Sequence, residues 1–422
     1  MTGWKDFSAP VEMTECKDFS ALVEMTGWKD FSAPVEMTEC KDFSAPVEMT
    51  ECKDFSALVE MTIYMKALIT AGGHATRMRP ITYTINKHLI PLANKPMLCN
   101  AIEKIAEAGI HDIIVNVNPG ETQLQKHIGD GSRWNVSIKY VEQQGGPKGL
   151  AHIIKNAQPH LGHEPFLFYL GDNIILGSIR EFIDEFKQKN LDCMLALSKV
   201  KEPQRFGVPE IQNGRITRVI EKPENPPCDM AVTGIYVYSP KIFEAVCAIQ
   251  PSARGEYEIS DAHTWLIEHG AQVGYQEITG WWKDTGKPED LLEGNALLLN
   301  EMKLEEAVNE GQVNPDTVIQ GRVKIGKGTV IGSKCLIRGP VVIGEGCKIE
   351  HSFIGPHTSI GNNAQILNTE IEHSIIFEGA KINCGKRIVD TLIGKDAVVT
   401  SENETLPRGH KLIIGDNAVV EL

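Results

Sequence analysis

The sequence of 422 residues lacks the features that mark several common classes of protein. It has no run of about 18 apolar residues, the length of a membrane span, and its first residues do not form a signal peptide. Its ten cysteines include no Cys-x-x-Cys pair, so they indicate reduced thiols rather than a metal site. Positive charge is also scarce, because the formal net charge is −14. We therefore expect a cytoplasmic protein that binds neither nucleic acid nor membranes.

Residues 1–60 are five tandem copies of a twelve-residue unit, Met-Thr-x-x-Lys-Asp-Phe-Ser-Ala-x-Val-Glu. A period of twelve keeps no apolar stripe on one side of a helix. Pro10, Pro34 and Pro46 would in addition interrupt a helix in three of the copies. We therefore expect a largely disordered extension, with a partner-binding arm as the alternative.

Residues 61–302 alternate short apolar strands with amphipathic helices, which predicts an α/β domain with a largely parallel, Rossmann-like sheet. The predicted strands Met65–Ile69 and Phe166–Leu170 both run directly into glycine-containing turns. Ligands of such sheets bind at the carboxyl ends of the strands. We therefore expect the active site at this edge.

The pattern changes again in residues 303–422, after a charged linker. Isoleucines stand six residues apart from Ile319 to Ile349, and the register resumes at Ile354. An apolar period of six predicts a parallel β-helix of hexapeptide repeats. We expect this segment to act as a scaffold that assembles the chain into a homo-oligomer.

Residues 69–80 read Ile-Thr-Ala-Gly-Gly-His-Ala-Thr-Arg-Met-Arg-Pro and follow the first strand of the α/β domain. A glycine-rich turn after a strand can present backbone N–H groups to phosphate, because no side chains stand in the way. Arg77, Arg79 and Lys87 add positive charge beside this turn. The expected ligand is a polyphosphate.

Further short motifs follow in a fixed order and spacing. They are Asn94-Lys95-Pro96-Met97, Pro147-Lys148-Gly149-Leu150-Ala151, Gly171-Asp172-Asn173, Phe206-Gly207-Val208, Glu221-Lys222-Pro223, Val232-Thr233-Gly234, Arg254-Gly255-Glu256 and Trp282-Lys283-Asp284-Thr285-Gly286. Together with the glycine loop, they make residues 65–422 resemble the long form of glucose-1-phosphate thymidylyltransferase. That family of sugar-1-phosphate nucleotidylyltransferases carries a left-handed β-helix after its catalytic domain, so the resemblance implies the same architecture here.

The resemblance implies transfer of a thymidylyl group from dTTP to glucose 1-phosphate, with release of pyrophosphate. Asp172 and Asp284 match the family's carboxylates that bind Mg²⁺. Arg77 and Lys87 lie where the family holds the triphosphate, and Lys222 matches the lysine that grips the sugar phosphate. The other implied substrate-binding residues are Gly72, Gly73, Gly207, Glu221, Thr233 and Gly234, together with Gln144 and Gly149, which match the family's base-recognition positions. The sugar phosphate itself attacks, so we nominate no Ser, Cys or His nucleophile.

One position departs from the family in a way that affects the phosphate loop. Ala75 stands where the family usually has glycine. If this position requires a positive φ, its Cβ costs on the order of 1 kcal/mol and could narrow the triphosphate site. His88 stands where many members have glutamine, and we assign it no role.

Three other functions stay open. A UTP-dependent sugar-1-phosphate uridylyltransferase shares most of the contacts that recognise thymine. A two-headed enzyme could also acetylate an amino sugar with a base from the β-helix. The histidines available for that reaction are His351, His357, His373 and His410. A non-catalytic regulatory homologue is disfavoured by the presence of Asp172, Asp284, Arg77 and Lys222 together.

Overall fold

The computed structural model of the protein describes residues 64–73, 75–278 and 282–401, with the backbone alone for Lys283 and Asp284. The repeats of residues 1–60 lie outside this part, as do His74 and His410. Contacts divide the chain into the units Met1–Thr62 and Ile63–Leu422. No helix in the described part is long and apolar enough to cross a membrane. The predicted domain limits at residues 60 and 302 stay predictions.

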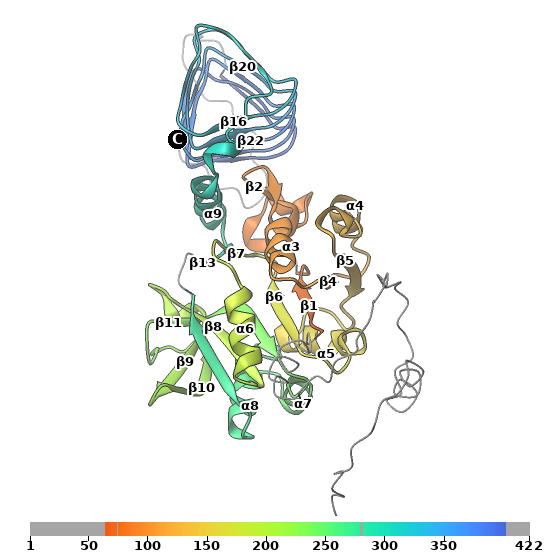
Figure 1. Cartoon of the computed structure of the whole chain (residues 1–422). Coiled ribbons are helices and arrows are strands. Elements are labelled where there is room, and N and C mark those ends of the chain that lie inside the picture. Colours follow the sequence, from red (N-terminus) through yellow and green to blue (C-terminus); the bar gives the residue numbers. More distant parts are fainter. Residues whose placement is uncertain (1–63, 74, 279–281, 402–422) are drawn as a thin grey trace, which may run out of the picture. The chain divides into compact units, whose positions relative to one another are not determined.

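The second unit begins with a seven-stranded mixed sheet in the order β12-β8-β11-β6-β1-β4-β5 (Figure 1). Its strands are β1 (Lys66–Thr70), β4 (Asp112–Val117), β5 (Ser137–Glu142), β6 (Phe166–Leu170), β8 (Cys193–Lys199), β11 (Met230–Tyr238) and β12 (Val273–Glu277). All neighbours pair in parallel except β11, which runs antiparallel to both β6 and β8. The predicted α/β class and largely parallel sheet are confirmed, and the reversed strand β11 is an addition to the prediction.

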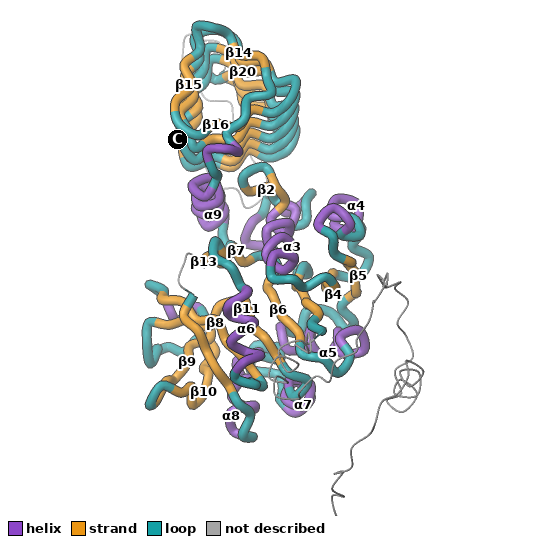
Figure 2. Tube along the Cα trace, viewed as in Figure 1, coloured by secondary structure: helices purple, strands orange, loops and turns teal. Residues whose placement is uncertain are grey.

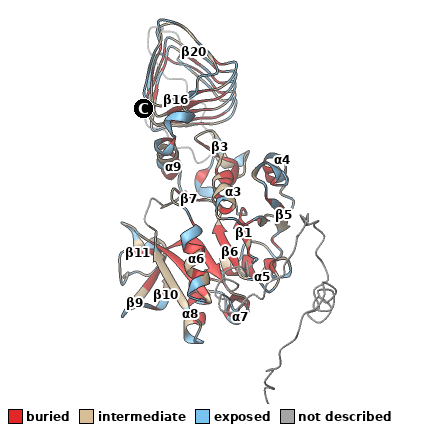
Figure 3. Ribbon diagram, viewed as in Figure 1, coloured by how far each residue is buried: buried red, intermediate tan, exposed pale blue. Residues whose placement is uncertain are grey.

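Helices cover both faces of this sheet because successive strand residues point to opposite sides. The helices are α3 (Met97–Glu107), α4 (Gln123–Ile128), α5 (Leu150–Leu161), α6 (Arg180–Gln188), α7 (Ile242–Ala248), α8 (Ile259–Glu268) and α9 (Pro288–Glu301). Ala67 and Ile69 of β1 belong to a buried cluster with α3 and α6. The intervening Leu68 belongs to a second cluster with α5, α7 and α8. The sheet is therefore the buried middle layer, as the coloured burial in Figure 3 shows.

Three small two-stranded sheets surround the carboxyl edge of the main sheet. They are β2 (Pro91–Leu92) with β3 (Lys95–Pro96), β7 (Asn173–Ile175) with β13 (Trp282–Asp284), and β9 (Gly207–Gln212) with β10 (Arg215–Glu221). Short 3₁₀ helices also occur there, among them η1 (Thr76–Met78) and η3 (Lys87–Leu89). Of the predicted site residues, these short elements carry Arg77, Lys87, Gly207, Glu221 and Asp284.

Residues 312–400 form three stacked parallel sheets, which are the faces of a parallel β-helix (Figure 2). The first sheet holds β14 (Gln312–Val313), β17 (Val330–Ile331), β20 (Lys348–Glu350), β23 (Gln365–Leu367), β26 (Lys381–Asn383) and β29 (Val398–Thr400). The second holds β15 (Val318–Gln320), β18 (Leu336–Arg338), β21 (Phe353–Ile354), β24 (Glu370–Glu372) and β27 (Arg387–Val389). The third holds β16 (Val323–Ile325), β19 (Val341–Ile343), β22 (Thr358–Ile360), β25 (Ile375–Ile376) and β28 (Leu392–Ile393).

The isoleucine period has a direct structural meaning in this β-helix. Ile331, Ile337 and Ile343, each six residues after the last, lie in successive sheets. Within one sheet, Ile331 pairs with Ile349, which pairs with Ile366. All of these side chains are at most 1% exposed, so they form one continuous internal stack. The predicted β-helix is confirmed.

Truncation of one stacked isoleucine tests this core. Ile349 is 0% exposed, so Ile349→Ala should lower the free energy of unfolding by about 2–5 kcal/mol through lost burial and an internal cavity. Val330 lies in the neighbouring strand of the same sheet but is 43% exposed, so Val330→Ala is the matched control. Chemical denaturation followed by circular dichroism measures both losses. Equal losses for the two variants would contradict the stacked core.

Candidate active site

The carboxyl ends of β1, β4 and β6 meet at one point of the main sheet. Thr70 lies in register with Asn116 on one side and Leu170 on the other. Gly171 follows β6 and donates its N–H to the Thr70 carbonyl at 3.1 Å. A Cβ at Gly171 would lie 2.4 Å from that carbonyl oxygen, so only glycine lets the two backbones approach so closely. This contact fixes where the next residue, Asp172, leaves the sheet.

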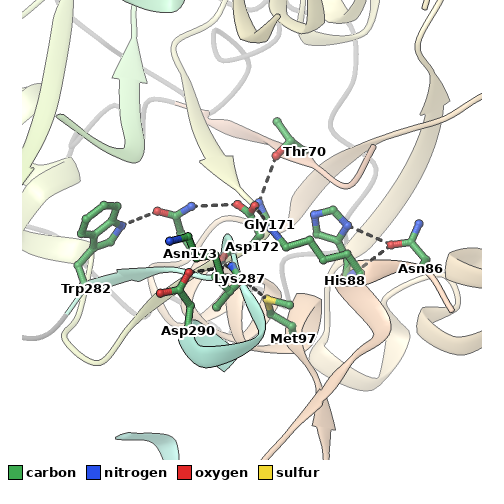
Figure 4. Close-up of polar contacts among 12 residues, drawn as sticks. Thr70, Asn86, His88, Met97, Gly171, Asp172, Asn173, Trp282, Lys287 and Asp290 are labelled. Carbon is green, nitrogen blue, oxygen red and sulfur yellow. Dashed lines mark hydrogen bonds and ion pairs between the residues drawn. The ribbon is translucent and has the colours of Figure 1, made fainter. Parts of the chain in front are cut away.

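Asp172 is held as a carboxylate by two partners (Figure 4). Lys87 Nζ lies 2.5 Å from Asp172 Oδ2, and the Asn173 side-chain amide donates to Oδ1 at 3.0 Å. Burial alone would raise the pKa of Asp172, but the charge and hydrogen bond of Lys87 and the amide of Asn173 outweigh it and lower the pKa to about 2. Two of the predicted site residues, Lys87 and Asp172, are therefore in direct contact.

His88 lies next to this ion pair and is almost fully buried, with 4% exposure. The Asn86 side-chain oxygen accepts from the His88 backbone N–H at 2.9 Å and lies 3.1 Å from Nδ1. Burial is the main cause that lowers the pKa of His88 to about 4. The imidazole is therefore neutral at pH 7, and Lys87 supplies the positive charge beside Asp172.

Strand β13 brings the backbone of Asp284 next to Asp172. In its antiparallel pairing with β7, Asp284 lies opposite Asn173. The Thr285 hydroxyl donates to the Asp172 carbonyl at 2.9 Å, and the Trp282 indole N–H donates to Asn173 Oδ1. Asp284 is thus paired with the residue that follows Asp172. The side chain of Asp284 lies outside the described part.

The donor set at this point suits a hard cation. The described residues contain no cluster of three His, Cys, Asp or Glu side chains that could hold a metal ion. Asp172 nevertheless offers an ionised carboxylate, and a second carboxyl residue, Asp284, ends the adjacent strand. Carboxylate oxygens shared with phosphate oxygens are the usual environment of Mg²⁺ in phosphoryl-transfer sites. Asp172 and Asp284 are therefore residues of the type that Mg²⁺ prefers, and the metal stays a prediction.

The glycine loop after β1 is held by a residue that the sequence did not single out, Asn118. Its side-chain oxygen accepts from the Gly73 N–H at 2.9 Å, and its amide donates to the Gly73 carbonyl at 3.0 Å. Gly73 has φ +99°, a conformation that glycine adopts without strain. Arg77, in the following turn η1, is exposed beside this loop. Asn118 thus clamps the turn that carries the predicted phosphate-binding residues.

A cavity of about 170 Å³ opens beside Asp172. Five of the predicted site residues line it, namely Asp172, Gly207, Glu221, Thr233 and Gly234. Several lining residues were not predicted, among them Asn173, Arg205, Phe206, Ser260 and Trp282. Asn173 and Trp282 belong to the same short motifs as Asp172 and Asp284, and Phe206 precedes Gly207, so their motifs carried a signal. Ser260 lies on α8, outside every recognised motif.

The shape of this cavity depends on two glycines and one carboxylate. A Cβ at Gly207 would lie 2.6 Å from Ser260 Oγ, and a Cβ at Gly234 would lie 2.7 Å from the Asn173 amide. Glu221 Oε2 accepts from the Ser260 hydroxyl at 2.8 Å, and Arg254 donates to Glu221 Oε1 at 3.1 Å. The cavity is therefore polar on one side and narrow where the glycines lie.

Two predicted residues, Thr233 and Gly234, lie on β11, and a third, Lys222, follows β10 directly. Thr233 and Gly234 fall where the pairing of β11 with β8 shifts register, and the Thr233 hydroxyl donates to the Ala196 carbonyl at 2.9 Å. Lys222 has φ 44°, and its Nζ lies 3.6 Å from Glu221 Oε1. Its backbone N–H donates to the Phe206 carbonyl at 2.9 Å. Lys222 thus flanks the cavity without lining it.

The predicted base-recognition residues lie in the loop before α5. Gln144 is exposed, and Gly149 has φ +93°. A Cβ at Gly149 would lie 2.6 Å from the Tyr257 carbonyl oxygen, so close backbone packing requires glycine here. A role of either residue in binding a base stays a prediction.

Ala75 has φ 45° and ψ 42°, so the condition for strain at this position is met. Ala75→Gly should raise the free energy of unfolding by on the order of 1 kcal/mol, because glycine adopts this conformation without a Cβ clash. Ala71, a buried alanine at the start of the same loop, provides the control, since Ala71→Gly should lower that free energy. Chemical denaturation checks both. The strain account is wrong if Ala75→Gly destabilises the protein or lowers its turnover.

The buried neutral His88 predicts a pH dependence of stability. The unfolded chain binds a proton at His88 below pH 6.5, whereas the folded protein binds it only below about pH 4. The contribution of neutral His88 to the free energy of unfolding is therefore complete above pH 6.5 and is lost as the pH falls towards 4. When the pH falls through this interval, the free energy of unfolding of His88→Gln should decrease less than that of the parent protein, by on the order of 3 kcal/mol. Denaturation at a series of pH values measures it, with His127→Gln, changed at an exposed histidine, as the control. An unchanged pH profile in His88→Gln would disprove the assignment.

Comparison with known proteins places this geometry in a family. The model of the nucleotidyl transferase family matches residues 66–301. A low-salt glycan biosynthesis nucleotidyltransferase of Haloferax volcanii, Agl11, is 40% identical over 361 residues, which cover 85% of this chain and 100% of that protein. A glucose-1-phosphate thymidylyltransferase of Streptomyces griseus is 40% identical over 359 residues, which cover 85% of this chain and 99% of that protein.

A solved structure shows the same relationship in three dimensions. A crystal structure from Bacillus anthracis, assigned as a glucose-1-phosphate thymidylyltransferase and containing sucrose, superposes with a TM-score of 0.53. It is 36% identical and covers 57% of this chain and 96% of its own. The resemblance inferred from the motifs is confirmed. The chain belongs to the nucleotidyl transferase family and is an enzyme of nucleotide-sugar biosynthesis that resembles glucose-1-phosphate thymidylyltransferases.

Proposed function

We propose that the enzyme transfers a thymidylyl group from dTTP to α-D-glucose 1-phosphate. An oxygen of the sugar phosphate attacks the α-phosphorus in line, and the bond from that phosphorus to the bridging oxygen breaks. Pyrophosphate leaves with that oxygen and its electron pair, and dTDP-glucose remains. The observation that carries the proposal is the ionised Asp172 at a strand end, paired with Lys87 and open to a cavity of sugar size. The Streptomyces relative, named for this activity, supports the choice of substrates.

The triphosphate side of the proposed site consists of the loop after β1 and the turn η3. The Gly72 N–H and the cations Arg77 and Lys87 would bind phosphate oxygens, while Gly73, whose N–H donates to Asn118, gives the loop its turn. Repulsion between the two anionic substrates is the main barrier to such a reaction, so fixed positive charge at this place lowers it. Lys87 is 13% exposed and already oriented by Asp172, which limits the cost of ordering it.

Asp172 and Asp284 would hold the Mg²⁺ ion. When bound, this ion would neutralise phosphate charge and orient the α-phosphate for attack. The chain's own contribution is to keep Asp172 ionised and to fix its backbone through Gly171 and Thr285. The low pKa of Asp172 keeps the carboxylate available at any physiological pH.

The sugar side of the proposed site is the cavity beside β7. Glu221, held by Ser260 and Arg254, would accept hydrogen bonds from sugar hydroxyls, and Lys222 would bind the sugar phosphate. Gly207 and Gly234 leave the space in which a sugar ring can approach the backbone. Gln144 and Gly149 would recognise the base.

Uridylyl transfer from UTP is the nearest alternative, and pyrophosphate release separates the two. The assay uses glucose 1-phosphate and Mg²⁺ with dTTP, UTP, ATP or CTP in turn, and we expect the highest kcat/KM with dTTP. A preference for UTP would reassign the base specificity. If no nucleotide gives pyrophosphate release, the result would support the regulatory homologue. Consumption of acetyl-CoA would support the two-headed enzyme.

Substitution of Lys222, the lysine proposed to bind the sugar phosphate, tests the sugar side. Lys222→Ala should raise the KM for glucose 1-phosphate by about tenfold to a hundredfold, because one charged hydrogen bond to phosphate is lost. The KM for the nucleotide should stay within a factor of about two. Lys189→Ala, at an exposed lysine of the turn after α6 that pairs with Glu185, is the control. An unchanged KM for glucose 1-phosphate in steady-state kinetics would remove Lys222 from the site.

A further inference from the structure

A buried apolar cluster joins the catalytic domain to the β-helix. We call it the junction cluster, and its members are Met78, Ile90, Leu92, Met97, Ile174, Leu291, Leu292, Ile375 and Phe377. Ile375 belongs to strand β25 of the β-helix, and Phe377 follows that strand directly. The other members come from the catalytic domain and from α9. The β-helix therefore shares a hydrophobic core with the catalytic domain.

The members from the catalytic domain stand directly beside the residues proposed to bind the triphosphate and metal. Met78 follows Arg77 in η1 and is 1% exposed. Ile90 comes three residues after Lys87, and Ile174 comes two residues after Asp172. Both are 0% exposed. Three separate segments of the triphosphate side are thus anchored in the junction cluster.

A buried amide fixes the same junction through hydrogen bonds. Asn295 of α9 is 0% exposed, and its side-chain oxygen accepts from the Ala93 N–H at 2.8 Å and from the Ser359 hydroxyl at 2.6 Å. Its amide donates to the His357 carbonyl at 3.0 Å. The Asn94 amide in turn donates to the Ile360 carbonyl at 2.7 Å. A buried amide that is satisfied on both domains specifies one relative position.

Helix α9 packs against β7, the strand that begins at Asn173, directly after Asp172. A Cβ at Gly294 would lie 2.7 Å from Ile174 of β7, so helix and strand are in close contact. The same helix follows β13, the strand that ends in Asp284. The Glu221 wall of the sugar cavity is held differently, because the partners of Glu221 are Ser260 and Arg254 of the catalytic domain. The triphosphate side and this wall therefore have different supports.

We propose that the β-helix positions the triphosphate half of the active site, with Phe377 as a positioning residue that acts through the junction cluster. This inference rests on the proposed function for the identity of the substrates. It gives the β-helix a part in nucleotide binding in addition to that of a scaffold. Loss of its support should loosen η1 and η3 while Glu221 and its partners in the sugar cavity keep their positions.

The test compares two truncations inside the β-helix of the full chain. Phe377→Ala opens the junction cluster, whereas Ile366→Ala removes a residue that is 0% exposed in the internal isoleucine stack and is not a member of that cluster. Phe377→Ala should raise the KM for dTTP by about threefold to tenfold and leave the KM for glucose 1-phosphate unchanged. Ile366→Ala should change neither KM. Phe377→Leu, which keeps part of the apolar side chain, should raise the KM for dTTP by a smaller factor than Phe377→Ala, and it replaces Phe377→Ala in the comparison if that variant does not fold.

A second measurement keeps this inference separate from the proposed function. Amide hydrogen exchange of residues 76–92 should be faster in Phe377→Ala than in Ile366→Ala, with or without substrates. If the parent enzyme shows no turnover but this difference in exchange is found, the proposed function fails and the support by the β-helix stands. If exchange is alike in the two variants, or if both KM values rise together, the inference is overturned.

Discussion

The ion pair between Lys87 and Asp172 is the interaction on which the rest of the site depends. A partly buried carboxylate would be costly at the end of an apolar strand unless a cation and hydrogen bonds compensated it. Lys87 and Asn173 provide this compensation, and neutral His88 fills the space beside them. The consequence is a charged group fixed at the point where the loops of the triphosphate side and the cavity of the sugar side meet.

Close backbone packing gives this charged group its place. Gly171 and Gly234 each occupy positions where a Cβ would overlap a neighbouring atom, so they bring β1, β7 and β11 together around Asp172. The clamp of Asn118 on Gly73 and the packing of α9 on β7 fix the surrounding turns. The short elements at this edge are thus held by tertiary contacts, because strands of two or three residues have little stability of their own.

Much of this was predictable where the sequence is locally periodic or carries a motif. The isoleucine period of six predicted the β-helix, because isoleucines six residues apart lie in successive sheets. The glycine turns after β1 and β6 predicted the edge of the main sheet at which the candidate site lies. Lys87 and Asp172, which the motifs assigned to phosphate and metal, form an ion pair, and their roles stay predictions. Asn118, Ser260 and the junction cluster were not predictable, because each depends on contacts between segments far apart in the chain. The antiparallel direction of β11 was not predictable either, because an apolar run does not indicate the direction of its strand.

The central claim is that Asp172 and Asp284 together hold one divalent ion for the triphosphate. Electron paramagnetic resonance of Mn²⁺ measures this directly, because the signal of the free ion falls as the ion binds to protein and dTTP. The account predicts that Asp172→Asn and Asp284→Asn each weaken the binding of Mn²⁺ in the presence of dTTP by about tenfold or more, and that Asp316→Asn, changed in the turn between β14 and β15 of the β-helix, does not. Binding as tight as in the parent enzyme after either of the first two substitutions would contradict it.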